Sequence, residues 1–241
     1  LQAAPLDDKA PDPVVDWIRM VSINRLTGHS PGFFSGRTMP PTQAVGVEAQ
    51  RKINEREGRQ PPPRNVIDLI LKKSRSLLSD GYPPQQQQPA QFYVRPAHDT
   101  PDIRDHSVAL VVTSPPFLDT VQYADDNWLR CWFAGIDLSR IEIAMHRTQE
   151  AWTAFVRGTL RELARVLKPG GYLAFEVGEV RGGKVLLERL VWQAAEGLPF
   201  ERQGVIVNQQ EFTKTANCWG VSNNAKGTNT NRIVVLRRNG A

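Results

Sequence analysis

Cysteines, metal-binding clusters and long apolar runs are scarce or absent in this 241-residue sequence. Its two cysteines, Cys131 and Cys218, lie far apart and in no spacing typical of a zinc site. The sequence therefore offers no disulfide framework, which is typical of proteins from a reducing compartment. No apolar stretch approaches the roughly 18 residues that a membrane span needs, and nothing in this sequence leads us to expect a signal peptide. We expect a cytoplasmic protein with no metal site and no membrane partner.

Basic residues are unevenly distributed along the chain. The formal net charge is only +5, but eleven lysines and arginines oppose four acids between Trp17 and Leu78. Helical periodicity interrupted by turn residues predicts three helices in this region, at residues 14–26, 42–57 and 66–80. Residues 1–80 are therefore predicted to form a basic helical lobe. The charge alone favours a nucleic-acid partner only slightly, because solvated surface helices often carry alternating charge.

A low-complexity stretch divides the sequence. Residues 81–91 contain Pro83-Pro84, four consecutive glutamines and Pro89, which is a linker composition. A chain of this length forms one large domain or two small ones, and we expect residues 92–241 to form the part with the larger core. The sequence begins at Leu1 rather than at methionine, so we expect a fragment or a processed product.

Strand and helix patterns alternate after the linker. Apolar residues at helical spacing predict a helix from Thr148 to Leu167, which ends at Lys168-Pro169-Gly170-Gly171. Short apolar runs predict strands at residues 91–94, 108–112, 172–177, 204–208 and 232–237, and a second helix is predicted at 184–196. Four further residues are expected on a helix that packs on the sheet: Trp128, Cys131, Trp132 and Phe133. This alternation predicts an α/β fold.

The most informative feature is the sequence Thr113-Ser114-Pro115-Pro116-Phe117, directly after the predicted strand at 108–112. Proline donates no N–H and restricts the residue before it, so the diproline ends the strand abruptly. The result is a rigid polar tip at the carboxyl end of a buried inner strand, where open α/β sheets bind ligands. Such a tip offers fixed carbonyls and a hydroxyl to a planar amine, with an aromatic ring beside them.

Ser114-Pro115-Pro116-Phe117 resembles motif IV of the amino-group DNA methyltransferases, whose pattern is Asp/Asn/Ser-Pro-Pro-Tyr/Phe. The serine form looks like the version that methylates cytosine at N4. The helix, the Leu-Lys-Pro-Gly-Gly sequence and the strand at 172–177 are similar to the segment that leads into the fifth strand of class I methyltransferases. The resemblance covers residues 92–237, and it implies a Rossmann-like sheet whose last two strands form an antiparallel pair at one edge.

The resemblance also implies roles for individual residues. S-adenosyl-L-methionine is the implied cofactor, with Asp99 and Thr113 beside it, although a plain turn aspartate is an alternative for Asp99. The target base is flipped out of the duplex. Ser114 and the carbonyl of Pro115 accept hydrogen bonds from its amino group, Pro116 completes the corner, and Phe117 stacks on the base. Neither cysteine lies in a Pro-Cys motif, which counts against chemistry at cytosine C5.

One expected part of the family pattern is missing. These enzymes bind the methionine part of the cofactor on a Gly-rich loop, typically Asp-Pro-Phe-x-Gly-x-Gly-Thr, and no such sequence precedes Asp99. Residues 175–183 contain glycines, but they follow the fifth strand and lack Gly-x-Gly spacing. A permuted order is not expected either, because only residues 238–241 follow the last predicted strand in this sequence. We therefore expect the first strands to be left out or supplied by another chain, and weak or no activity of this chain alone.

Two regions are predicted to contact double-stranded DNA. In the basic lobe, Arg37 and Lys52 are candidates for phosphate contacts, and an ordinary solvated lobe is the alternative. The stretch between the last two strands, residues 208–231, is long and rich in Asn, Thr and Gly. Long loops in compact domains are usually functional or disordered, and Lys214, Trp219 and Lys226 are its candidate DNA contacts.

The sequence thus predicts a DNA methyltransferase of restriction–modification type, or its catalytic half, acting on cytosine N4. Methylation of adenine N6 is the first alternative. An RNA or protein methyltransferase and a non-catalytic DNA-binding subunit are the others.

Overall fold

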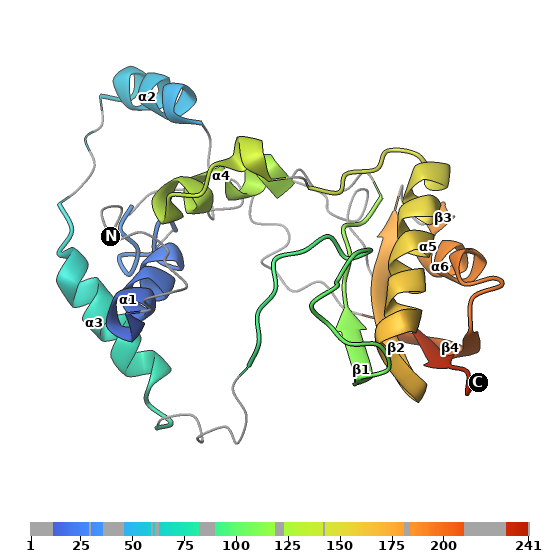
Figure 1. Ribbon diagram of the computed structural model, residues 1–241. Helices are drawn as coiled ribbons and strands as arrows, with labels where there is room; N and C mark the ends of the chain where they lie inside the picture. Colours follow the sequence, from blue (N-terminus) through green and yellow to red (C-terminus); the bar gives the residue numbers. More distant parts are fainter. Residues whose placement is uncertain are drawn as a thin grey trace. The chain divides into compact units, whose positions relative to one another are not determined.

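A computed structural model of the chain describes residues 12–28, 30–35, 46–58, 60, 63–81, 90–118, 123–141, 143–180, 184–209 and 230–240 (Figure 1). The chain divides into two compact units. One unit consists of Leu1–Pro89 and Gln122–Ile143, and the other of Ala90–Val121 and Ala144–Ala241. The expected division placed all of residues 92–241 in one part, whereas here a helical segment from within that range belongs to the first unit.

The first unit is helical. It contains α1 (Pro13–Ile23), α2 (Val47–Arg56), α3 (Val66–Leu77), α4 (Tyr123–Ala134) and the short 3-10 helix η2 (Leu138–Arg140). Asp12 begins α1, because its carboxylate accepts the N–H groups of Val14 and Val15 at 2.9 and 3.1 Å. The indole N–H of Trp17 on α1 donates to the hydroxyl of Ser74 on α3 at 2.9 Å. The three helices predicted in the lobe are confirmed, although the second was expected to begin within residues 36–45, which are outside the described ranges.

Helix α4 corrects one prediction. Its aromatic residues were expected to pack on the sheet, but the helix belongs to the helical unit and contacts α1 and η2. Trp132 is 59% exposed, and Trp128, Cys131 and Phe133 are only half-buried. Helical spacing of apolar residues shows which face of a helix is apolar, but it does not show which neighbour that face meets.

The second unit is built on a mixed sheet. Its strands are β1 (Val108–Thr113), β2 (Leu167–Val180), β3 (Val185–Leu186), β4 (Phe200–Gln209) and β5 (Thr230–Arg238). The order is β1-β2-β5-β4; β1 and β2 are parallel, β5 is antiparallel to both of its neighbours, and β3 pairs with the end of β2. The predicted α/β fold with parallel and antiparallel strands is confirmed, including the antiparallel final pair at one edge.

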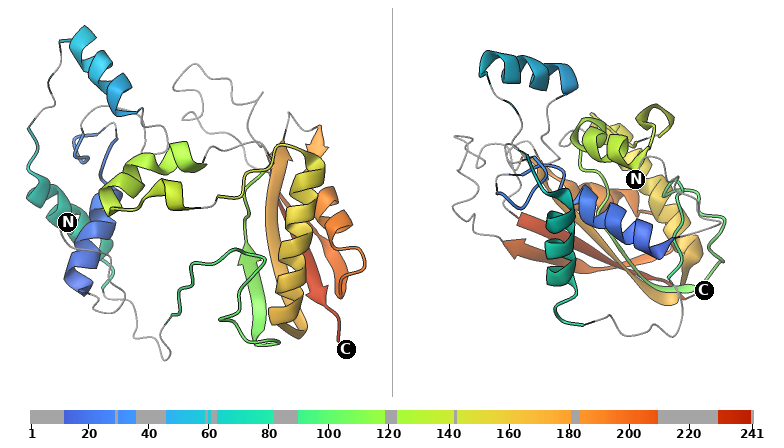
Figure 2. Two further views of the ribbon diagram at one scale, coloured as in Figure 1. Left: turned by 45° about the horizontal axis from the view of Figure 1, so that its top comes forward. Right: turned by 90° about the vertical axis from the view of Figure 1, so that its left-hand side faces the viewer.

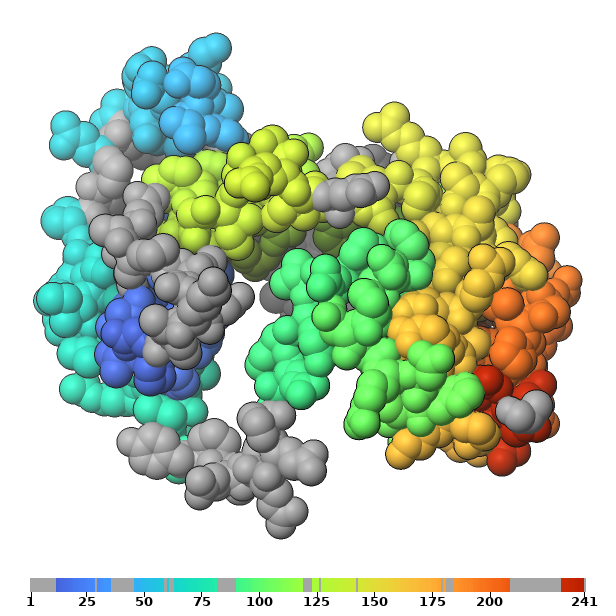
Figure 3. Space-filling model, viewed as in Figure 1, coloured from blue at the N-terminus to red at the C-terminus, as the bar shows by residue number. Residues whose placement is uncertain are grey.

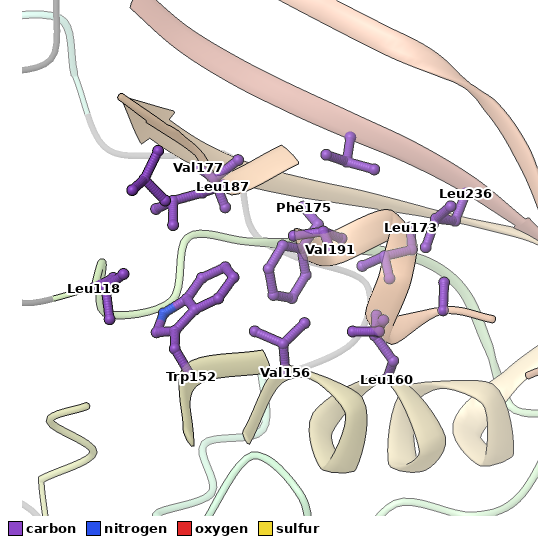
Figure 4. Close-up of a cluster of buried hydrophobic side chains, with 14 of the residues drawn as sticks. Leu118, Trp152, Val156, Leu160, Leu173, Phe175, Val177, Leu187, Val191 and Leu236 are labelled. Carbon is purple, nitrogen blue, oxygen red and sulfur yellow. The ribbon is translucent and has the colours of Figure 1, made fainter. Parts of the chain in front are cut away.

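Two helices, α5 (Gln149–Val166) and α6 (Leu187–Ala194), lie along the same side of the sheet (Figures 1 and 2). Thr148 caps α5 by accepting the N–H of Ala151 at 3.2 Å. Trp152, Val156 and Leu160 follow one another at four-residue spacing on α5, and all three are fully buried. They meet alternate residues of β2 and β5 in one core, with Leu187 and Val191 from α6 (Figure 4). This burial of apolar surface is the main stabilising term of the unit.

The opposite face of the sheet corrects the expected environment of β1. The motif strand was predicted to be a buried inner strand, but in the described sheet it is an edge strand. Leu110 and Val112 on this face are 58% and 72% exposed, as are Tyr172 and Ile206 at 44% and 59%. A continuous apolar run predicts burial on both faces, and the described residues cover only one. In Figure 3, β1 and the segment before it form a continuous exposed surface beside α5 and β2.

One local prediction needs correction, and the end of one helix is confirmed. Residues 91–94 were expected to form a strand, but they form none, and Phe92 and Val94 are 90% and 100% exposed. The helix predicted to end at residues 168–171 does end there, because α5 stops at Val166. These residues belong to β2, where the pairing with β1 shifts from Val108↔Leu167 to Leu110↔Tyr172. The bulge needs glycine: Gly170 has φ +77°, and a Cβ on Gly171 would lie 2.9 and 3.0 Å from two backbone carbonyl oxygens.

Candidate active site

The predicted polar tip, residues Ser114–Phe117, is called the corner below. It lies at the carboxyl end of β1, as the sequence predicts. Thr113 is the last residue of the strand and pairs with Phe175 of β2, so Ser114–Phe117 leave the sheet beside a fully buried residue of the core. Pro115 is buried and Ser114 is exposed. Among the residues that the structure describes, the hydroxyl of Ser114 has no hydrogen-bond partner. The corner therefore exposes the hydroxyl of Ser114 to solvent, while the next residue, Pro115, is buried.

The core holds the corner from beneath. Leu118 is 1% exposed, and Phe117 is half-buried against the same core. The indole N–H of Trp152 donates to the carbonyl of Pro116 at 2.9 Å. Figure 4 shows Leu118 and Trp152 next to each other at one end of the core. Phe117 is thus partly covered by the core, so only part of its side chain is exposed for the predicted stacking on a base.

The segment that contains Asp99 contacts α5 at a different point from the corner. The N–H of Asp99 closes a turn by donating to the carbonyl of Pro96 at 3.0 Å, and its side chain is exposed. The next residue, Thr100, donates its N–H and its hydroxyl to Glu162 at 2.8 and 2.6 Å. Glu162 is ten residues, or about 15 Å, further along α5 than Trp152. The structure therefore does not bring Asp99 together with Thr113 or with the corner, and the cofactor contacts of both residues stay predictions.

A cluster that sequence reasoning missed fixes the segment before β1. The guanidinium of Arg165 donates to the carbonyls of Thr100 and Ile103, both at 2.9 Å, and also to the carboxylates of Glu162 and Asp105. The hydrogen bond from Arg165, aided by Thr100, lowers the pKa of Glu162 to about 2. The same two carboxylates raise the pKa of Arg165. The cluster ties residues 100–105 to the last turns of α5 and so positions the start of the motif strand.

A buried ion pair joins α6 to β5 at the corner's end of the sheet. Arg232 donates to the carboxylate of Glu188, and the two side chains are only 19% and 8% exposed. Arg232 pairs with Val177, two positions beyond Phe175, which faces Thr113. Removing one partner of such a pair leaves a buried charge, so we assign it the role of holding α6 on the sheet.

The predicted DNA contacts are only partly described. Lys52 lies exposed on α2 of the helical unit. On the same helix, Arg51 pairs with Glu48 at 3.2 Å, with both side chains largely exposed. Arg37, Lys214, Trp219 and Lys226 lie outside the described residues. The DNA-contact roles of all five candidates therefore stay predictions.

A groove of about 640 Å³ lies between α5 and α6, away from the corner. Its lining mixes polar and apolar side chains and includes Thr153, Arg157 and Gln193, and none of the predicted site residues lines it. Arg157 spans the two helices, because it donates to the carbonyls of Ala194 and Glu196 at 3.0 and 2.7 Å. These bonds satisfy free carbonyls at the end of α6, so we assign Arg157 a structural role.

Within the described ranges, no three His, Cys, Asp or Glu side chains gather closely enough to hold a metal ion. None of the helices seen there is long and apolar enough to cross a membrane.

Comparisons with known proteins give similarity to solved structures only, because no family model and no curated protein matches the chain. A putative DNA modification methylase from Thermus thermophilus matches with 22% identity over 61% of this chain and 53% of its own, at a TM-score of 0.40. The same protein in complex with S-adenosyl-L-methionine gives a TM-score of 0.38. The chain thus spans about half the length of the Thermus protein.

Two further structures show lower identity. A SAM-dependent methyltransferase from Methanosarcina mazei is 14% identical over 74% of this chain and 80% of its own, with a TM-score of 0.38. The PvuII cytosine-N4-specific DNA methyltransferase is 14% identical over 56% of this chain and 44% of its own, with a TM-score of 0.35. These comparisons do not assign the chain to a family.

Proposed function

We propose that this chain is the catalytic half of an S-adenosylmethionine-dependent DNA methyltransferase that modifies an exocyclic amino group, with cytosine N4 as the target atom. The observation that carries the proposal is the sequence Ser114-Pro115-Pro116-Phe117 at the carboxyl end of β1, next to the parallel strand β2. Carboxyl ends of parallel strands are where open α/β sheets bind their ligands. Adenine N6 is the alternative target atom, because the motif serves both reactions.

The role of the corner is to orient an amino group. An amine within the base stack is out of reach, so the base must first be flipped out, at a cost of a few kcal/mol. The exposed hydroxyl of Ser114 and the carbonyl of Pro115 accept hydrogen bonds from the two amino hydrogens, which directs the nitrogen lone pair away from the corner. Holding a nucleophile in one orientation supplies much of the rate in such transfers.

The cofactor needs more than the described residues provide. When bound, S-adenosylmethionine supplies an activated methyl group. The two residues assigned to it by resemblance lie apart: Asp99 precedes a residue bonded to Glu162 near the end of α5, whereas Thr113 ends β1 beside the corner, which bonds to the first turn of α5. No sequence of the Gly-rich type is present. The residues that the structure describes therefore do not fit the cofactor by themselves. We propose that an upstream segment or a second chain carries the Gly-rich loop.

The DNA is proposed to contact the helical unit through its phosphates. Lys52 is exposed on α2, within a segment where basic residues outnumber acids by eleven to four. Phosphate contacts of this kind supply affinity without reading sequence, and they weaken steeply with salt. Arg37, Lys214, Trp219 and Lys226 are proposed as further contacts.

The proposal is tested by analysing methylated nucleosides. The purified chain is incubated with duplex DNA and tritiated S-adenosylmethionine at millimolar concentration, and the nucleosides are separated by mass. We expect slow formation of N4-methyldeoxycytidine, and at least about a tenfold loss in Ser114→Ala, because the amine loses one of its orienting acceptors. Ser107→Ala is the control, because that hydroxyl donates to the carbonyl of Arg104, before β1.

Three results would contradict the proposal. Methyl transfer to RNA or protein in preference to DNA would favour the alternative substrate class. Methylation of cytosine at C5 would exclude the amine chemistry. Salt-sensitive DNA binding with no methyl transfer and no heat of binding for S-adenosylmethionine, even when a polypeptide that carries the Gly-rich loop is added, would favour a non-catalytic DNA-binding subunit.

A further inference from the structure

The hydrogen bond between Trp152 and Pro116 joins the corner to a helix 36 positions away in sequence. Trp152 is fully buried on the first turn of α5. Its own N–H donates to the carbonyl of Thr148 at 3.1 Å, and its ring lies among the core residues. The indole N–H is therefore a fixed donor, because the helix and the core determine where it lies.

The corner itself has little conformational freedom. Each proline ring fixes its own φ near −65°, and a residue that precedes proline is restricted to extended ψ values. These two rules fix the φ and ψ of Pro115 and the φ of Pro116. One soft backbone angle is left in the diproline, the ψ of Pro116, and this angle sets the direction of the carbonyl that Trp152 holds.

We infer that Trp152 is a positioning residue for the corner: its indole N–H fixes the last free angle of the diproline and so sets how Ser114, Pro115 and Phe117 meet a base. The functional side of this inference rests on the function proposed above. The bond also divides the acceptors of the corner between two tasks. The carbonyl of Pro116 is used internally, whereas neither the hydroxyl of Ser114 nor the carbonyl of Pro115 has a hydrogen-bond partner among the described residues.

Trp152→Phe is the informative variant, because it keeps an aromatic ring in the core and removes the donor. Trp192→Phe is the matched control. Trp192 is a half-buried tryptophan of the same unit, on α6, whose indole nitrogen is buried and finds no hydrogen-bond partner among the described residues. Its ring is covered by the guanidinium of Arg202, 5.7 Å from the ring centroid. Both variants therefore lose an indole, but only one loses a bond to the corner.

The conformational readout uses the dipeptides of the sequence. Pro-Phe occurs at Pro116-Phe117 and at Pro199-Phe200 only. In a chain labelled with ¹³C at the proline carbonyl and ¹⁵N in phenylalanine, a carbonyl–amide correlation spectrum therefore contains two peaks. We expect Trp152→Phe to move or broaden the Pro116-Phe117 peak and to leave the Pro199-Phe200 peak in place. Trp192→Phe should leave the Pro116-Phe117 peak unchanged.

The catalytic readout separates positioning from folding. In the methyl-transfer assay, we expect Trp152→Phe to lower kcat about tenfold while KM for DNA stays within about twofold, because base contacts remain but their orientation is lost. Thermal melting of both variants measures the structural cost. A merely structural role would lower the melting temperature and leave kcat of the folded fraction unchanged.

The outcomes distinguish this inference from the proposed function. A Pro116-Phe117 peak that stays unchanged in Trp152→Phe overturns the inference whatever the activity. If the wild-type chain is active, an unchanged kcat in Trp152→Phe overturns it too. A shifted peak together with a lowered kcat supports it. If Trp152→Phe shifts the peak but the wild-type chain transfers no methyl group to DNA, even when a polypeptide that carries the Gly-rich loop is added, the proposed function is refuted and the contact between Trp152 and the corner is upheld.

Discussion

Replacing Glu162 with glutamine isolates the charge of one side chain in the cluster that precedes the motif strand. The substitution keeps the size of the side chain and an oxygen that accepts from Thr100, and it removes the negative charge facing Arg165. The Glu162 side chain is only 12% exposed, so its interaction with Arg165 is sheltered from solvent on one side. We therefore expect Glu162→Gln to destabilise the sheet unit at neutral pH.

The magnitude follows from the lowered pKa. A carboxyl whose pKa falls from its ordinary value of 4.5 to about 2 on folding contributes about 3.4 kcal/mol of stability at neutral pH. The Arg165 side chain is 31% exposed, so solvent screening reduces this figure, and we expect a loss of about 2 kcal/mol. Because the folded pKa is depressed, the contribution is complete above the unfolded value near 4.5 and is lost as the pH falls toward about 2.

Urea unfolding of wild type and Glu162→Gln at pH 7 and at pH 3 measures the effect. We expect the difference in the free energy of unfolding to fall below about 1 kcal/mol at pH 3, because much of the stabilisation from the depressed pKa is already lost there. Asp102→Asn is the control. Asp102 pairs with Arg95 at 2.7 Å on the surface, with side chains 35% and 49% exposed, and its loss should have a smaller effect at both pH values. An equal difference at pH 7 and pH 3 would refute the charge-based reasoning.

Two further predictions concern the sheet. Gly171→Ala should destabilise the unit by about 1–3 kcal/mol in urea unfolding, because its Cβ would lie 2.9 and 3.0 Å from backbone oxygens. The control Gly204→Ala, whose Cβ would have nothing within 4 Å, should cost less than about 1 kcal/mol. Equal losses of stability in the two variants would argue against the bulge geometry. Val112→Lys should leave stability in urea unfolding nearly unchanged, because Val112 is 72% exposed on an edge strand of the described sheet. Val111→Lys, on the core face, should destabilise the unit strongly, and similar stabilities of the two variants would show that the faces are misassigned.

Local patterns made the fold predictable where the signal lies within one element. Helix α5 was predicted because its buried residues recur at helical spacing after Thr148, and the corner because two prolines end a β-branched run. The exposure of β1 and the lack of a strand at residues 91–94 were not predictable, because apolar composition does not report which faces the described chain covers. The same limit applies to α4, whose neighbours are set by tertiary structure.

The candidate site shows the same division. The corner could be found from sequence because its residues are contiguous. The contact of Trp152 with Pro116 and those of Arg165 with residues 100–105 could not, since these partners lie 36 and 60 or more positions away and neither residue belongs to a motif. The sequence around a tryptophan or an arginine on an amphipathic helix does not indicate which distant backbone carbonyl its side chain will bind.

Helix α5 holds both ends of the motif strand β1 in place. Trp152 fastens the exit of β1 and Arg165 fastens its approach, and the two residues are thirteen positions apart, or about 20 Å along a helix axis. Six residues of extended chain, the length of β1, also span about 20 Å. β1, an edge strand of the described sheet, is thereby held at both ends by one helix. The two contact points on the helix are separated by about the length of the strand. A one-residue insertion in α5 would rotate one contact point by about 100° relative to the other, so the spacing of these two side chains should tolerate no change.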